Sequence, residues 1–180
     1  MKHTQHTMRR GFTFIEVLLY MGIVSLMLTA IVSFAWVIID AGVKSATQQE
    51  VYATTRYVSE RLMYEIRNAA GIDVSDFDVN LASDETKNCS LAQEGTSESL
   101  RIFVSNNQVF MRLPSLEIVP LQSTDTKVTN LTFTDYSSGD SKAKYVGFVL
   151  TVESNYPGAA GRQEYQESVT IRSGVEVRSH

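Results

Sequence analysis

The chain has 180 residues, enough for one domain with its own core and an accessory segment, and we expect no second full domain. Its formal charge is -4. Three of its basic residues, Lys2, Arg9 and Arg10, precede Gly11, whereas all twenty acidic residues follow it. The chain beyond Gly11 therefore has thirteen basic residues and a formal charge of -7. An acidic body with scattered basic residues disfavours bulk nucleic-acid binding, and a single cysteine, Cys89, excludes an intramolecular disulfide.

Residues 12–40 form the first predicted element, a hydrophobic helix that follows a basic leader at 1–11. From Phe12 to Ile39 there is one charged residue, Glu16, and no proline. A helix of this length rises roughly 40 Å, which is enough to cross a hydrocarbon core of about 30 Å. The basic residues precede the apolar run and Asp40 follows it, so the sequence predicts a single-pass protein with a cytoplasmic N-terminus and an extracytoplasmic body.

Two simpler interpretations of this segment remain open. A cleaved secretory signal could use Ser33-Phe34-Ala35 as its cleavage site, although the apolar run before that site is longer than the usual 7 to 15 residues. An uncleaved signal anchor accounts for the length and the flanking charges. It leaves Glu16 unexplained.

Glu16 is costly in a membrane, because a carboxylate in hydrocarbon must be paired or neutralised. If the chain is cut between Gly11 and Phe12, the new α-ammonium group of Phe12 becomes a possible partner. The pair could form within one subunit or between neighbouring subunits. In either case we expect Glu16 to set the register of assembly.

The run RGFTFIEVL, from Arg10 to Leu18, resembles the processing motif of type IV pilins and type II secretion pseudopilins. The resemblance covers residues 1 to about 40. It implies cleavage after Gly11 by a prepilin peptidase, N-methylation of Phe12 and a docking role for Glu16. The implied partners are other pilin or pseudopilin subunits, an inner-membrane assembly platform, and membrane lipid before assembly, and the implied product is a pilus-like or secretion-like filament at the cell surface.

One departure from the family pattern bears on the type of subunit. Many major pilins have a proline near the twenty-second mature residue, where this chain has Ser33, and its first proline is Pro114. Gly22 and Gly42 are the only weak points for a helix in this region. The departure favours a minor or divergent subunit, and it leaves a pilus, a secretion pseudopilus and a DNA-uptake apparatus all open.

Residues 41–71 continue the helix in amphipathic form. Val51, Val58, Leu62, Ile66 and Ala69 share one helical face, which predicts packing against a sheet. The pairs Arg56/Glu60 and Arg61/Glu65 have i,i+4 spacing and are expected on the surface, and Gly71 is expected to cap the helix.

Residues 72–180 are predicted to form a globular body. Residues 72–99 are polar and acidic, and we expect a long loop with at most a short strand. Beyond Leu100 the pattern alternates and predicts hairpins at 100–113 and 128–152, an edge strand at 116–119 and a final strand at 165–171. The expected fold class is α+β, with one long helix packed on a small antiparallel sheet of about five strands, as in pilins.

Candidate catalytic chemistry is sparse. The three histidines, His3, His6 and His180, all lie near the ends of the sequence, which argues against a histidine-dependent hydrolase in the body. Asp73, Asp76 and Asp78 lack the glycine and distal glutamate of a calcium loop. We therefore predict no enzyme activity, metal or cofactor, with a signal-anchored extracytoplasmic enzyme or binding domain as the alternative.

Overall fold

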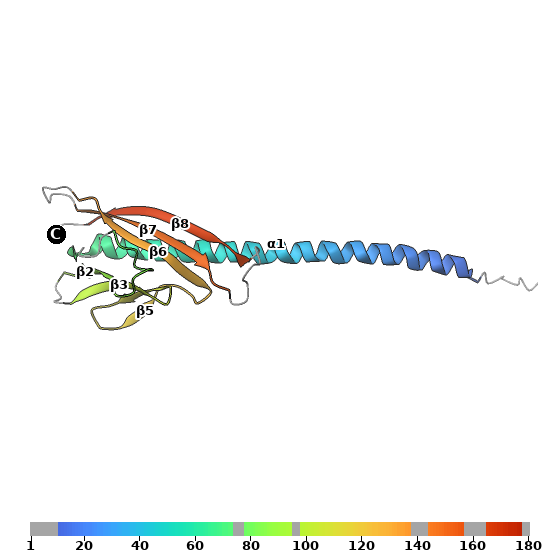
Figure 1. Cartoon of the computed structure of the whole chain (residues 1–180), viewed down its shortest axis with the longest axis horizontal. Helices are drawn as coiled ribbons and strands as arrows, with labels where there is room; N and C mark the ends of the chain where they lie inside the picture. Colours follow the sequence, from blue (N-terminus) through green and yellow to red (C-terminus); the bar gives the residue numbers. More distant parts are fainter. Residues whose placement is uncertain (1–10, 74–77, 95–97, 138–143, 157–164, 178–180) are drawn as a thin grey trace, which may run out of the picture. The chain divides into compact units, whose positions relative to one another are not determined.

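The structure is a computed structural model that describes residues 11–73, 78–94, 98–137, 144–156 and 165–177. The chain divides into two compact units, Met1–Gly42 and Val43–His180, which are described separately. One helix, α1 (Phe14–Asn68), belongs to both units (Figure 1). It continues without a break through Gly22 and Gly42, the two weak points of the sequence.

In the first unit, α1 has no buried side. Every apolar residue from Phe12 to Ile39 is exposed, and the best 18-residue window reaches a mean hydropathy of 2.4. The helix is long and apolar enough to cross a membrane, as predicted. Because the apolar side chains surround the whole helix, this unit requires lipid or other helices as its solvent.

In the second unit, α1 is amphipathic and its predicted face is confirmed. Val51, Val58, Leu62 and Ile66 are fully buried, and Ala69 is 1% exposed. The helix ends at Asn68, so the prediction of a cap at Gly71 is wrong. The chain has already joined a sheet there, since the amide of Ala70 donates to the carbonyl oxygen of Ala92 at 2.8 Å.

The body contains two antiparallel sheets, which share one hydrophobic core with the second half of α1 (Figure 1). The first sheet has the order β1-β2-β3-β4-β5 and the second β6-β7-β8. The strands are β1 (Gly71–Asp73), β2 (Asn88–Ala92), β3 (Ser99–Ser105), β4 (Gln108–Arg112), β5 (Ile118–Pro120), β6 (Thr126–Asp135), β7 (Tyr145–Ser154) and β8 (Ser168–Glu176).

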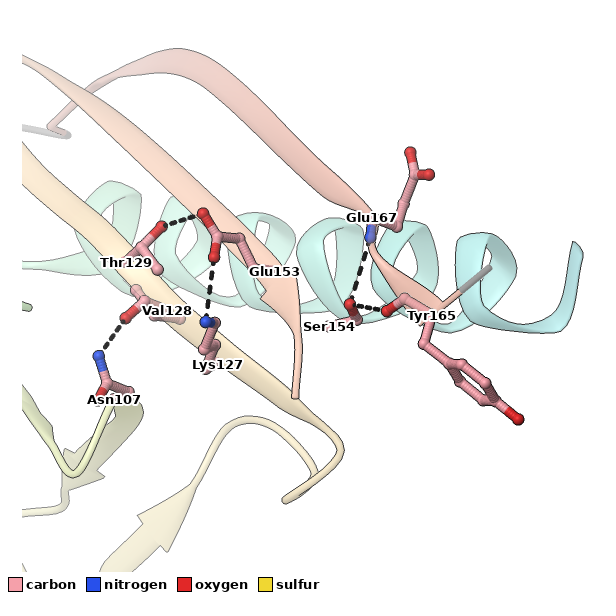
Figure 2. Close-up of polar contacts among 8 residues, drawn as sticks. All are labelled: Asn107, Lys127, Val128, Thr129, Glu153, Ser154, Tyr165 and Glu167. Atoms are coloured by element: carbon pink, nitrogen blue, oxygen red, sulfur yellow. Dashed lines mark hydrogen bonds and ion pairs between the residues drawn. The ribbon is translucent and has the colours of Figure 1, made fainter. Parts of the chain in front are cut away.

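The predicted α+β fold class, both hairpins and the edge position of β5 are confirmed. The prediction of a single sheet is wrong, because the strands form two sheets. The sheets meet at one short connection, where Asn107 and Val128 exchange two hydrogen bonds. Figure 2 shows the bond from the Asn107 side-chain amide to the Val128 carbonyl oxygen, at 3.3 Å. The final strand also lies later than expected, at Ser168–Glu176.

The predicted loop at 72–99 has more structure than expected. It contributes β1 and β2 to the first sheet and then protects the edge of β6 in the second. Asn80 bridges to Thr132, and its side-chain oxygen accepts from the amides of Ala82 and Leu131, both at 3.0 Å. Asp76, from the aspartate series, lies outside the described residues.

The two predicted ion pairs on α1 form, but only one lies on the surface. Arg56 and Glu60 are exposed and lie 2.7 Å apart. Glu65, 2.6 Å from Arg61, is buried, with 8% of its side chain exposed. Its position beside Ile66 places it at the margin of the core, so the expectation of a surface location is wrong for this residue.

Polar contacts fasten the start of the second unit to both sheets. The carboxylate of Glu50 accepts hydrogen bonds from the hydroxyls of Tyr156 and Ser123. Next to Tyr156, the Ser154 hydroxyl donates to the carbonyl oxygen of Tyr165 and accepts from the amide of Glu167 (Figure 2). The Glu50 bonds tie two strand connections of the body to α1, and the Ser154 bonds hold together the residues on either side of the β7–β8 connection.

Candidate processing and assembly segment

The predicted cleavage bond, Gly11–Phe12, lies outside the helix. Residues 11–13 have no regular secondary structure, and α1 begins at Phe14. Gly11 is exposed, and a side chain built on it would meet nothing within 4 Å. The bond is therefore exposed and outside regular secondary structure. Lys2, Arg9 and Arg10 lie outside the described residues.

Thr13 ends the irregular segment by capping the helix. Its carbonyl oxygen accepts from the amides of Glu16 and Val17 at 3.1 and 3.2 Å, and its hydroxyl lies 3.4 Å from the Glu16 nitrogen. The sequence Thr13-Phe14-Ile15-Glu16 has the spacing of a capping box. This signal could have placed the helix start, and our sequence analysis missed it.

Glu16 lies in the first turn of α1, where a negative charge is favoured by the helix dipole. One carboxylate oxygen accepts a long hydrogen bond, 3.5 Å, from the hydroxyl of Tyr20, one turn further along. The ring of Phe12 packs edge-on against Tyr20, with centroids 6.5 Å apart. Tyr20 thus links the first mature residue to the carboxylate, a role that the i,i+4 spacing from Glu16 could have suggested.

Three hydroxyl side chains further along the helix satisfy their own hydrogen bonds. Ser25, Thr29 and Ser33 each donate to the carbonyl oxygen four residues earlier, at 2.8, 2.9 and 3.0 Å. Hydroxyls bonded in this way can enter hydrocarbon without an unsatisfied donor. Ser25 also lines a groove of about 610 Å³ with Phe12, Val17, Tyr20, Met21 and Val24, so the groove begins at Phe12.

Comparison with protein families identifies this segment. Residues 6–32 match the family model of the prokaryotic N-terminal methylation motif. This match supports a protein of the type IV pilin/pseudopilin type. The match spans Gly11, Phe12 and Glu16 and leaves the body outside its range. No curated protein and no solved structure matches the chain.

The motif establishes the general role of this pilin-like protein. Proteins with this motif are processed by prepilin peptidase and assemble with other pilin subunits, and the motif together with the apolar helix supports membrane anchoring followed by incorporation into a surface filament. The motif belongs to structural proteins and not to enzymes. Within the described ranges, no group of three or more His, Cys, Asp or Glu side chains could hold a metal ion.

Proposed function

We propose that the chain is a minor pilin or pseudopilin, a structural subunit of a type IV pilus-like or type II secretion-like filament. In this proposal prepilin peptidase cuts between Gly11 and Phe12, Phe12 is N-methylated, and Glu16 directs assembly. The observation that carries it is the exposed, non-helical Gly11–Phe12 bond directly before a capped apolar helix, inside the matched motif.

Cleavage requires that the peptidase reach an unwound backbone. Gly11 presents no side chain, and Thr13 prevents the helix from extending back over the bond. Lys2, Arg9 and Arg10 keep the leader on the cytoplasmic side in this proposal, so that the cut is made at that membrane face while the body remains outside.

Assembly follows from the charges that cleavage creates. The new α-ammonium at Phe12 lies at the N-terminal end of the helix, where the dipole disfavours a positive charge. Among the described residues, Glu16 has only the long bond from Tyr20 as a side-chain partner, so its carboxylate can accept a stronger, charged donor. The ammonium of a neighbouring subunit fits that requirement and would draw the subunit out of lipid into the filament through the assembly platform.

The minor-subunit assignment rests on the helix itself. A major pilin of the proline-containing kind has a built-in weak point, whereas α1 runs unbroken from Phe14 to Asn68. We propose that this suits a subunit present in few copies better than the repeating subunit of a flexible fibre.

The test of this proposal is Gly11→Ala in the native host, with Gly22→Ala as the matched control because both glycines have open space around a built side chain. We expect a mature mass starting at methylated Phe12 for the wild type and for the control, and an unprocessed precursor for Gly11→Ala. Intact mass and N-terminal sequencing of the membrane fraction distinguish these products. Normal maturation of Gly11→Ala, or an uncut wild type, would favour the signal-anchor alternative.

A further inference from the structure

The outer face of the first sheet carries a basic and aromatic patch. Packing of the sheet against the core does not explain this patch, because the core contacts the opposite face. The inner positions of β3 and β4 are buried in the core, whereas Arg101, Phe103, Phe110 and Arg112 point away from it and are exposed or half-buried. The register sets Arg101 directly opposite Arg112, and Phe103 opposite Phe110. The two phenylalanine rings stack, with centroids 5.6 Å apart.

The arginine pair lacks compensation in the body. Among the described residues, neither guanidinium has a hydrogen bond, and neither has a carboxylate within ion-pair distance. Like charges directly opposite each other on a sheet reduce its stability. The arginine pair thus lowers the stability of the sheet, and it occurs in a chain whose mature form has a formal charge of -7. Residues that lower stability in this way indicate a function other than folding of the body.

A small depression beside the pair has the size and chemistry for one anionic group. Its volume is about 150 Å³, and its lining includes Arg101, Arg112, Lys87 and Asn88. Glu85 is also on the lining, but its two oxygens accept from the Asn106 amide at 2.6 Å and the Ser105 hydroxyl at 3.3 Å, at the β3–β4 turn. With Arg101 and Arg112 against the single carboxylate of Glu85, the depression keeps an excess of positive charge.

We propose that this patch, Arg101 and Arg112 with Phe103 and Phe110, binds a carboxylate-bearing polypeptide segment of a neighbouring subunit. A guanidinium pair matches the geometry of carboxylates, and the stacked phenylalanines offer an apolar surface to the flanking residues. The chain beyond Gly11 has twenty acidic residues and thirteen basic ones, so acidic neighbours of the same kind are the complementary partners. This inference rests on the proposed function as a filament subunit.

The binding test uses the full chain in detergent micelles, titrated with a tetraglutamate peptide that is blocked at both ends, and follows by NMR the backbone amide signals of β3 and β4, which every variant retains. Arg101→Gln/Arg112→Gln is compared with Arg172→Gln, an exposed strand arginine of β8. We expect the double variant to weaken binding by about tenfold or more and Arg172→Gln to leave it unchanged. The double variant should also melt about 1–4 °C higher, because the repulsion is removed.

Competing ligands and filament assembly complete the test. Equal peptide binding by all three proteins overturns the proposal, and so does tighter binding of oligo-dT or inorganic phosphate than of tetraglutamate at this site. In cells, the double variant should reduce assembly while maturation after Gly11 continues. If Gly11→Ala matures normally, the filament role fails. The micelle titration still reports on the patch by itself.

Discussion

The two halves of α1 share one unbroken backbone and differ in almost every other respect. Leu26, in the first half, is 75% exposed, whereas Leu62, in the second, is fully buried. The first half is apolar on all sides, and the second has one apolar face and charged pairs elsewhere. The first half of the helix thus has the pattern of a segment surrounded by lipid or other helices, and the second half has the pattern of a helix packed on a globular core.

This difference teaches that burial within one chain is an incomplete measure of what a residue does. The exposed apolar side chains of the first unit are functional only in an environment that the single chain does not provide. Those of the second unit are already satisfied by the sheets. Substitutions in the first half should therefore alter assembly, and substitutions in the second should alter the stability of the body.

The largest effect is expected at the start of the first half. Glu16→Ala should leave maturation intact and strongly reduce filament assembly, because no carboxylate remains to pair with the neighbouring ammonium. Tyr20→Phe keeps the ring that contacts Phe12 and removes only the hydroxyl, so we expect a smaller loss. Counting filaments by electron microscopy, with mass analysis of the subunit, measures both steps.

Glu60→Ala is the control for this comparison, because it removes an exposed carboxylate from the other half of the same helix. Filament numbers for that variant should equal those of the wild type. Normal filaments from Glu16→Ala would show that the charge in the membrane helix has no part in assembly.

The next effect concerns the core. Leu62→Ala should lower the free energy of unfolding of the body by about 2–5 kcal/mol, through lost burial and a residual cavity. Leu26→Ala should change that quantity by less than about 0.5 kcal/mol. Thermal unfolding in detergent, followed by circular dichroism of the strands, is the measurement. Fluorescence is unsuitable because the single tryptophan, Trp36, belongs to the apolar unit.

If Leu26→Ala destabilises the body as much as Leu62→Ala, the two units are energetically coupled and the contrast drawn above is wrong. Equal and small effects from both variants would instead mean that the body tolerates a cavity beneath its sheets.

Features set by local pattern were predictable from the sequence, and features set by distant pairing were not. The buried face of α1 follows from helical spacing, and the processing motif from its own residues. The division into two sheets depends on which strands pair, β4 with β5 and β6 with β7, and alternation within a strand carries no information about that pairing. Likewise the sequence of β2 predicts a loop, because only Cys89 and Leu91 form its buried side and their neighbours are polar.

The candidate site shows the same limit. Gly11, Phe12 and Glu16 were inferred from sequence because the motif is contiguous, and Thr13 could have been inferred from its capping-box spacing. The arginine patch could not, because Arg101 and Arg112 become neighbours only through the β3–β4 register. Counting the basic residues of an acidic chain therefore does not reveal this arginine patch.

The smallest predicted effect concerns the polar contact between Glu50 and Tyr156, which are 106 positions apart and fasten α1 to the body. The neutral phenol of Tyr156 donates to the carboxylate of Glu50. This hydrogen bond, with burial and the nearby negative charge, raises the pKa of Tyr156 from 10 to about 12. Tyr156→Phe should therefore lower the free energy of unfolding by about 1 kcal/mol near neutral pH.

The direction of the expected pH dependence follows from the raised pKa of Tyr156. Because the pKa of Tyr156 is higher in the folded chain than in the unfolded one, its contribution is fully present below pH 10 and is lost as the pH rises through about 12. The difference in unfolding free energy between wild type and Tyr156→Phe should shrink over that interval. Melting of both proteins at several pH values from 8 to about 11.5 measures it. Equal stability of the two proteins near neutral pH would mean that packing of the ring against Tyr165, which Tyr156→Phe keeps, and not the hydrogen bond, holds this connection.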